Sequence, residues 1–320
     1  MSWLIWRQHR LAGVSALVVL MGVAIPLLIT GLAMRGAYDQ LGLAACIGNT
    51  DGRCSDLLAQ FSEQYRGWGQ QWLPWLNFVP GLLGALVGAP LVARELEQRT
   101  HLLAWTQGVT RRRWLAIKLA VLVLAIVILG VAFTALISWW RWPLDQLEGR
   151  FQPNSFDFEG LVPTAYTLCA FALGSFLGVL LRRTVPAMAI MIAAFFLIRY
   201  PLIEVLLRPH LQRALQLTAS PTGFVKQDIL ANNGSWIIAS GMQDSSGRHL
   251  SGDEINQLVR QAFESGVSPP TWFQQHGYLR WVLYQPADRF WTFQAVEAAI
   301  FVALAILAMV VTVSLVRRLT

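Results

Sequence analysis

The chain has 320 residues, of which 55% are hydrophobic and 13% are charged, and its mean hydropathy is +0.48. Soluble domains carry about 25% charged residues, so this composition excludes an ordinary soluble protein and predicts a surface that largely faces lipid. The formal net charge is +7. A basic surface for nucleic acid is one explanation of that charge, but its distribution along the chain favours a membrane protein with a basic cytoplasmic face.

Six stretches of the chain are long and apolar enough to cross a bilayer. A spanning helix needs about 20 mostly apolar residues. Four of these stretches contain no charged residue, the fifth contains Arg199 and Glu204, and the sixth contains Glu297. They cover residues 11–34, 73–93, 119–140, 161–181, 185–207 and 291–316. The sequence therefore predicts an all-α membrane protein with six transmembrane helices and both termini on one side.

The basic residues indicate the orientation of these helices. If both termini are cytoplasmic, the short inner segments hold 12 of the 25 basic residues and only two of the 18 acidic residues. The basic ones are Arg7, Arg10, Arg94, Arg99, Arg111, Arg112, Arg113, Lys118, Arg182, Arg183, Arg317 and Arg318. Inner segments of membrane proteins carry an excess of Lys and Arg. We therefore expect cytoplasmic termini and no binding of nucleic acid.

The first outer loop, residues 35–72, contains an amphipathic stretch and two cysteines. Apolar side chains recur there at helical spacing, at Leu57, Leu58, Phe61 and Tyr65. Cys46 and Cys54 share this loop, and an extracytoplasmic compartment is oxidising. Two interpretations stay open for the pair, a disulfide or two free thiols.

Two pairs of glycines have the spacing that lets helices approach closely. Gly84 and Gly88 lie in the second span, and Gly174 and Gly178 lie in the fourth. Small residues at this spacing either join subunits or pack helices within one chain. The sequence alone favours packing within the chain.

The inner link between the second and third spans is the most informative segment. It leaves the membrane with Glu95 and Glu97, continues as a short amphipathic run over residues 100–106, and is broken by Gly108. Such a run predicts a short helix across the inner face of the membrane. It either docks in a groove of a partner protein or rests on the lipid headgroups.

Two further outer segments follow. Residues 141–160 are short and acidic, and we expect an outer loop there. Residues 208–290 are long enough to fold into a small α/β cap; the alternative is a loop without fixed structure. Asn233-Gly234 predicts a turn into a strand at Trp236, and Ser251 with Glu254 forms a capping box that predicts a helix to about Ser265. The expected division is residues 1–207, the cap at 208–290, and the last span with its tail at 291–320.

The charged residues within the spans predict an ion pair. Helix rise places Arg199 and Glu297 at equal depth, roughly 9 Å below the outer face of the hydrocarbon core. Pairing would lower the cost of both charges, which is about 2.5–3.5 kcal/mol each on insertion scales. Two alternatives are that Arg199 extends outward to the headgroups or pairs with Glu204. An Arg199–Glu297 pair would act as a static brace or as a gate latch.

Motifs for catalysis are absent from the sequence. It contains no GxxxxGK[ST] nucleotide loop, no CxxC and no HExxH, and its five histidines are scattered. We therefore expect no enzyme activity and no metal site in this chain. Any energy source must then be a partner or a gradient.

Four places in the chain resemble permeases of the ABC-2 type. The opening SWLIWRQHR is similar to that family's interfacial elbow helix, and ARELEQRTHLLAWTQGVTRRRW is similar to its coupling-helix region. YQPADRFWTFQAVEA, before the last span, resembles actinobacterial members, and the six-span plan with a long last outer loop fits throughout. The cap is larger than in many such permeases.

The resemblance implies an exporter in a bacterial plasma membrane, built from this chain, a second permease copy or homologue, and two ATPase subunits. ATP and Mg²⁺ would bind to the ATPases, and this chain would need no cofactor. A coupling helix near residues 95–106 would contact the ATPase through Glu95, Glu97, Thr100, Leu102, Leu103 and Trp105. The substrate would be hydrophobic or amphipathic and would move by alternating access. The alternative is a secondary transporter or channel without an ATPase, which is expected to show more ionisable groups within its spans.

Overall fold

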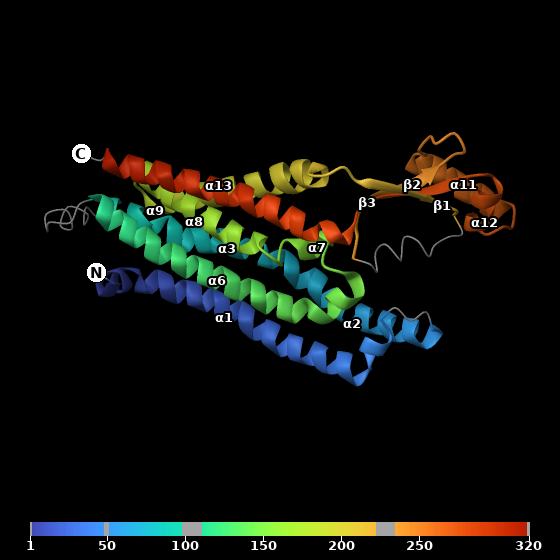
Figure 1. The fold of residues 1–320 in the computed structure, drawn as a ribbon, viewed down its shortest axis with the longest axis horizontal. Coiled ribbons are helices and arrows are strands. Elements are labelled where there is room, and N and C mark those ends of the chain that lie inside the picture. The colour runs from blue at the N-terminus through green and yellow to red at the C-terminus, as the bar shows by residue number, and fades with distance from the viewer. Residues whose placement is uncertain (1, 48–50, 98–110, 222–233, 319–320) are drawn as a thin grey trace. The chain divides into compact units, whose positions relative to one another are not determined.

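A computed structural model describes residues 2–47, 51–97, 111–221 and 234–318. These residues are mostly helical and divide into two compact units (Figure 1). The first unit is Met1–Pro143, Asn154–Arg208 and Trp291–Thr320, and the second is Leu144–Pro153 and Pro209–Phe290. The second unit matches most of the segment that was expected to form a cap, and it also includes residues 144–153 from the preceding connection.

The described residues include six helices that are long and apolar enough to cross a membrane, and these lie wholly or mostly in the first unit. They are Leu20–Gln40, Pro74–Arg94, Ala116–Leu147, Val162–Leu181, Thr184–His210 and Ala287–Arg317. The elements that form them are α1 (Ser2–Gln40), α2 (Gly52–Leu76), α3 (Phe78–Leu83), η2 (Gly84–Gly88), α4 (Pro90–Glu97), α6 (Arg111–Glu148), α8 (Val162–Leu181), α9 (Thr184–Leu197), η3 (Ile198–Leu207), η4 (Arg208–His210) and α13 (Phe290–Arg317). Two short elements, η1 (Leu43–Ala45) and α7 (Pro153–Phe156), lie in connections. The chain is thus a multi-pass membrane protein.

Two spans form the centre of the helical unit. In the apolar 18-residue windows of Pro74–Arg94 and Val162–Leu181, 67% of the residues are buried, against 17–28% in those of the other four. The glycine pairs explain how the two central helices approach so closely. A Cβ on Gly84 would lie 2.5 Å from the backbone carbon of Ala170 on α8, and one on Gly174 would lie 2.7 Å from the carbonyl oxygen of Gly84. The glycines therefore pack helices within this chain, as the sequence favoured.

The N-terminal region forms one helix. α1 begins at Ser2 and continues unbroken to Gln40, so the opening residues are its first turns and do not form a separate elbow element. After α1, Cys46 and Cys54 are joined by a disulfide bond. The predicted amphipathic stretch lies in α2, where Phe61 is fully buried and its ring centroid is 6.0 Å from that of Tyr38 on α1.

The second unit is a small α/β fold. Its antiparallel sheet has the order β1 (Leu215–Ala219), β3 (Leu279–Gln285), β2 (Trp236–Gln243), and its helices are α11 (Gly252–Glu264), α12 (Pro269–Gln275) and the short η5 (Ala287–Arg289). Ala262, Trp272 and Phe273 are the centre of its apolar core. The predicted capping box is confirmed, since Ser251 and Glu254 each accept a hydrogen bond from the other's backbone N–H. The strand expected at Trp236 is also present.

Candidate functional site

The residues predicted to couple the chain to an ATPase lie at the end of α4 and beyond it. Thr100, Leu102, Leu103 and Trp105 fall outside the described residues, and Glu95 lies within α4. Glu97 is the last residue of α4, and its carboxylate accepts hydrogen bonds from the backbone N–H (3.2 Å) and the hydroxyl (2.9 Å) of Thr184. These bonds lower the pKa of Glu97, with a further contribution from the charge of Arg183. Because Thr184 is the first residue of α9, Glu97 ties the end of α4 to the start of α9.

The predicted ion pair is replaced by a larger cluster. Arg199 and Glu297 are both buried, with 1% and 0% of their surface exposed, but each has other partners. Arg199 pairs with Asp157 (3.0 Å to Oδ2) and also donates to the backbone and side-chain oxygens of Asn77. Glu297 pairs with Arg208, at 2.9 Å from Nε to Oε2 and 2.8 Å from Nη2 to Oε1. The prediction of a direct pair is therefore corrected, because Asp157 and Arg208 are nearer partners.

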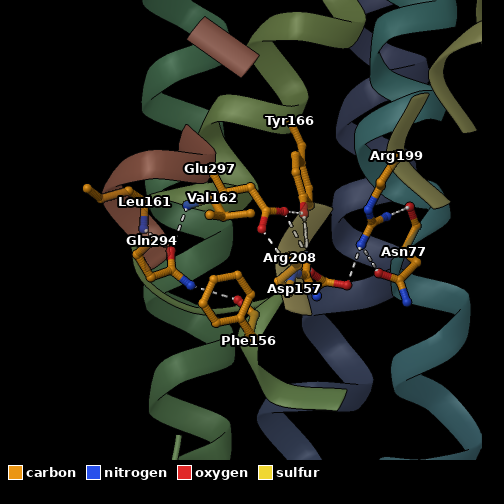
Figure 2. Close-up of polar contacts among 10 residues, drawn as sticks. All are labelled: Asn77, Phe156, Asp157, Leu161, Val162, Tyr166, Arg199, Arg208, Gln294 and Glu297. Atoms are coloured by element: carbon orange, nitrogen blue, oxygen red, sulfur yellow. Dashed lines mark hydrogen bonds and ion pairs between the residues drawn. The ribbon is translucent and has the colours of Figure 1, made fainter. Parts of the chain in front are cut away.

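Arg208 and Tyr166 join the two halves of this cluster (Figure 2). Arg208 donates to Oδ1 of Asp157 as well as to Glu297, and it is 3.0 Å from the Tyr166 hydroxyl. That hydroxyl also donates to Glu297 and lies 3.2 Å from Asp157. The charge cluster, as we call it, consists of Asn77, Asp157, Tyr166, Arg199, Arg208 and Glu297.

A π-helix brings the two arginines to one side. η3 is π-helical over Ile198–Leu207, so its backbone follows an i→i+5 pattern and winds more slowly than an α-helix. Arg199 and Arg208 are nine residues apart, which is about two and a half turns of an α-helix and would put them on opposite faces. The wider π-helix returns to roughly the same face over this distance. An α-helical interpretation of the sequence therefore could not find Arg208.

Asp157 comes from the connection that the sequence predicted to be a short acidic outer loop. The SFDFEG segment, residues 155–160, joins α7 to α8, and its Phe156, Asp157, Phe158 and Glu159 side chains are all at least 95% buried. The alternation of aromatic and acidic residues in this segment was the signal of burial that the sequence offered, because phenylalanine is among the residues most often buried. This part of the predicted outer loop is therefore buried.

Side chains from several helices hold the SFDFEG segment in place. Gln294 on α13 accepts hydrogen bonds from the backbone N–H groups of Leu161 and Val162, both at 3.0 Å, and donates to the carbonyl of Phe156 at 2.9 Å. Arg141 on α6 lies 3.4 Å from Glu159. Asp157 itself is held by η3 and η4 through the two arginines. One buried connection thus links α6, α8, α13 and the end of the fifth span.

Within the charge cluster two arginines are ion-paired with two carboxylates, and Glu204, half-buried on η3, lies near enough to act electrostatically on both arginines. Burial alone would raise the pKa of Asp157, but the charges of Arg208 and Arg199 outweigh it and hold that pKa below its usual value. Buried ion pairs are often no more stabilising than apolar side chains of the same size, and ionisable groups within membrane spans commonly mark a transport pathway. Among the described residues no group of His, Cys, Asp and Glu is suited to hold a metal ion. The charge cluster is therefore the candidate functional site.

The comparison with protein families agrees with this architecture. The model of a family described as ABC-2 membrane transporter related matches residues 17–208. This stretch is more than half of the chain and includes the first five spans, the SFDFEG segment and both arginines of the cluster. Neither a search of curated proteins nor a search of solved structures gave a significant match. The family match over these residues shows that the chain belongs to the ABC-2 membrane transporter related family.

Proposed function

We propose that this chain is the membrane-spanning permease subunit of an ATP-driven exporter, which moves a hydrophobic or amphipathic substrate by alternating access. The observation that carries the proposal is the family match over residues 17–208. The sequence has no GxxxxGK[ST] loop, so ATP and Mg²⁺ would bind to two separate ATPase subunits. A second copy of this chain, or a homologue, would complete the exporter.

The coupling to the ATPase is proposed to pass through residues 95–106. The contact of Glu97 with Thr184 supports this, because a displacement of the segment after α4 would be transmitted to the start of α9. The fifth span continues from α9 into η3 and η4, which carry the two arginines of the charge cluster. A movement at Glu97 could in this way reach the cluster through a single span.

The orientation in a bacterial plasma membrane is proposed with both termini in the cytoplasm, the opening residues 2–10 at the inner interface, and the second unit as an extracytoplasmic cap. The excess of basic residues on the inner segments supports it. The disulfide between Cys46 and Cys54 supports it independently, because disulfides persist outside the cytoplasm. In this orientation the charge cluster lies at the outer ends of the spans, where we propose that the SFDFEG segment acts as a gate.

Reconstitution with an ATPase tests the proposal. The tagged chain is co-expressed with a candidate ATPase, and co-purification, ATP hydrolysis and ATP-driven substrate movement in proteoliposomes are measured. Glu97→Lys should reduce assembly or uncouple hydrolysis from transport while the chain still inserts. Asp253→Lys, an exposed acid-to-base change on α11, is the matched control. Normal assembly and transport in Glu97→Lys would contradict the proposed coupling element.

One observation favours the alternative of a secondary transporter or channel. The charge cluster adds Asp157 and Arg208 to the ionisable groups at the spans, which is the feature expected of such a protein. Proteoliposomes that contain this chain alone, with an imposed proton or sodium gradient and no ATP, distinguish the two. Gradient-driven uptake without an ATPase would favour the secondary transporter.

A further inference from the structure

We infer that Arg199 and Arg208 bind the anionic group of an amphipathic monoanion, which takes the place of Asp157 when the SFDFEG segment moves away. The inference rests on the proposed transport function and names the class of its substrate. It concerns a carboxylate or phosphate group attached to an apolar tail.

The geometry of the two arginines is that of an anion site already occupied by an internal ligand. Arg199 approaches Oδ2 of Asp157 at 3.0 Å, and Arg208 donates to Oδ1 of the same carboxylate (Figure 2). Two guanidinium groups that converge on the two oxygens of one anion match the planar recognition of carboxylates and phosphates. Asp157 therefore stands where a substrate anion would bind.

Asp157 is the member of the cluster that is best placed to leave. It lies in a connection between helices, whereas Glu297 lies within α13 and has two hydrogen bonds to Arg208. A few hydrogen bonds and ion pairs hold the SFDFEG segment in place, chiefly the hydrogen bonds of Gln294. Movement of this short segment would remove one carboxylate and leave the rest of the cluster in place.

Charge balance then calls for an anion. Without Asp157 the ion-paired side chains are Arg199 and Arg208 against Glu297, a net charge of +1. Glu204, half-buried on η3, also acts electrostatically on both arginines but forms no ion pair with them in the described structure. A buried charge that loses its partner is strongly unfavourable, so release of the segment without a replacement would be rare. A monoanion restores neutrality. Arg199 also has a buried Nε with no hydrogen-bond partner in the described structure, which a ligand with more oxygens could satisfy.

The surroundings of the two arginines suit an apolar tail. The guanidinium carbon of Arg199 lies 4.5 Å from the ring centroid of Tyr166, which is on α8 and stays in place when the SFDFEG segment moves. The Tyr166 ring in turn contacts those of Phe195 and Phe301. An ion held at the arginines would therefore have aromatic neighbours for the first part of its tail. A small inorganic anion would lose those contacts.

Binding to the purified chain, without any ATPase, tests this inference. The protein is placed in phosphatidylcholine nanodiscs, and binding of dodecanoate is measured at mildly alkaline pH by calorimetry. Dodecanol, with the same tail and no charge, and acetate, with the charge and no tail, are the matched ligands. We expect dodecanoate to bind more tightly than either. Nanodiscs that also contain phosphatidylglycerol identify the source of the anion: competition points to a membrane lipid, and its absence points to a free amphiphile.

Four variants make the test specific. Asp157→Asn removes the internal competitor, and we expect it to tighten dodecanoate binding roughly tenfold, equivalent to about 1.4 kcal/mol. Arg199→Gln should abolish the preference for dodecanoate over dodecanol, whereas Arg199→Lys, which keeps the charge if Gln does not fold, should retain part of it. Arg35→Gln, an arginine outside the cluster, should leave the preference unchanged.

Equal binding of dodecanoate and dodecanol by the wild type, or unchanged dodecanoate affinity in Asp157→Asn, would overturn the inference. Because no ATPase is present, failure here is separate from failure of the proposed coupling.

Discussion

At the scale of single residues, Arg208 holds the charge cluster together. Its guanidinium contacts both buried carboxylates and the Tyr166 hydroxyl, while Arg199 contacts one carboxylate and Asn77. Taking such charges out of water is costly, and their attraction offsets that cost only while every member has its partners. The cluster is therefore sensitive to the loss of one member in a way that an apolar core is not.

Replacing Arg208 tests this dependence. Arg208→Gln leaves Asp157 with one arginine and Glu297 with none, and removal of one partner from a buried ion pair costs about 3–5 kcal/mol. We expect a clear fall in the unfolding temperature of the purified chain in detergent. Adding Glu297→Gln to Arg208→Gln should recover part of the loss, because the orphaned charge is removed. Arg213→Gln, an exposed arginine five positions on, is the control; an equal effect there would contradict the argument.

Glu254 gives a residue-scale prediction in the second unit. The backbone N–H of Ser251 and the guanidinium of Arg248 lower its pKa from 4.5 to about 2. Because the pKa is lower in the folded state, the stabilisation of the capping box is complete above pH 4.5 and is lost as the pH falls toward 2. An NMR titration of ¹³C-labelled glutamate, with the signal assigned by its loss in Glu254→Gln, should give a midpoint near 2.

The arginine contribution to that pKa has its own control. Arg248→Gln should raise the midpoint of Glu254, since the charge-assisted hydrogen bond is lost. Arg260→Gln, on the exposed face of the same helix, should leave it unchanged. A wild-type midpoint near 4.5 would mean that the capping box is not formed in solution.

At the scale of elements, both π-helices serve the helical unit in particular ways. η3 aligns Arg199 with Arg208, and η2 carries Gly84 and Gly88 against α8. Short π-helical stretches are rare and are found mainly at functional sites. In this chain they determine which charged side chains and which glycine backbones lie at the centre of the helical unit.

The close approach of the central helices predicts which glycines tolerate a methyl group. A Cβ on Gly88 would lie 2.4 Å from the carbonyl oxygen of Phe171, so Gly88→Ala must separate the helices; overpacking of this kind costs about 1–3 kcal/mol. Gly22, in α1, has nothing within 4 Å of such a Cβ. Gly22→Ala should be neutral or stabilising by about 0.5–1 kcal/mol. Unfolding temperatures in one detergent compare the two, and equal values would contradict the packing argument.

The elements also show which parts of the structure a sequence can predict. The six spans follow from long apolar runs, and the helix at Gly252–Glu264 follows from the capping box, because both signals are local. The SFDFEG segment and the partners of Arg199 do not follow. Hydropathy does not distinguish a π-helix from an α-helix, and a short acidic connection has the same composition whether it is solvated or buried against arginines. Helix rise placed Arg199 and Glu297 in the correct cluster but could not give their partners.

At the scale of the whole molecule, the proposed topology can be tested by labelling an introduced cysteine, and the three native cysteines need not be removed. Cys46 and Cys54 are bonded to each other, and Cys169 is buried, which raises the barrier to its reaction with a polar reagent. A cysteine introduced at an exposed position would therefore be the reactive thiol of the described chain. Two such positions, one in each unit, are Ser245 in a turn of the second unit and Arg318 after α13.

The final prediction is that these two positions lie on opposite sides of the membrane. Ser245→Cys should react with a membrane-impermeant maleimide in right-side-out vesicles, and Arg318→Cys should react only in inside-out vesicles. The physical reason is the distribution of charge, since Arg318→Cys still leaves 11 of the 12 basic residues on the inner segments. Denatured samples give the total reactive thiol as the reference. The opposite labelling pattern would place the second unit and the Cys46–Cys54 disulfide in the cytoplasm, where reducing conditions disfavour such bonds. That result would overturn the positive-inside assignment and, with it, the position of residues 95–106 on the side where ATP is available.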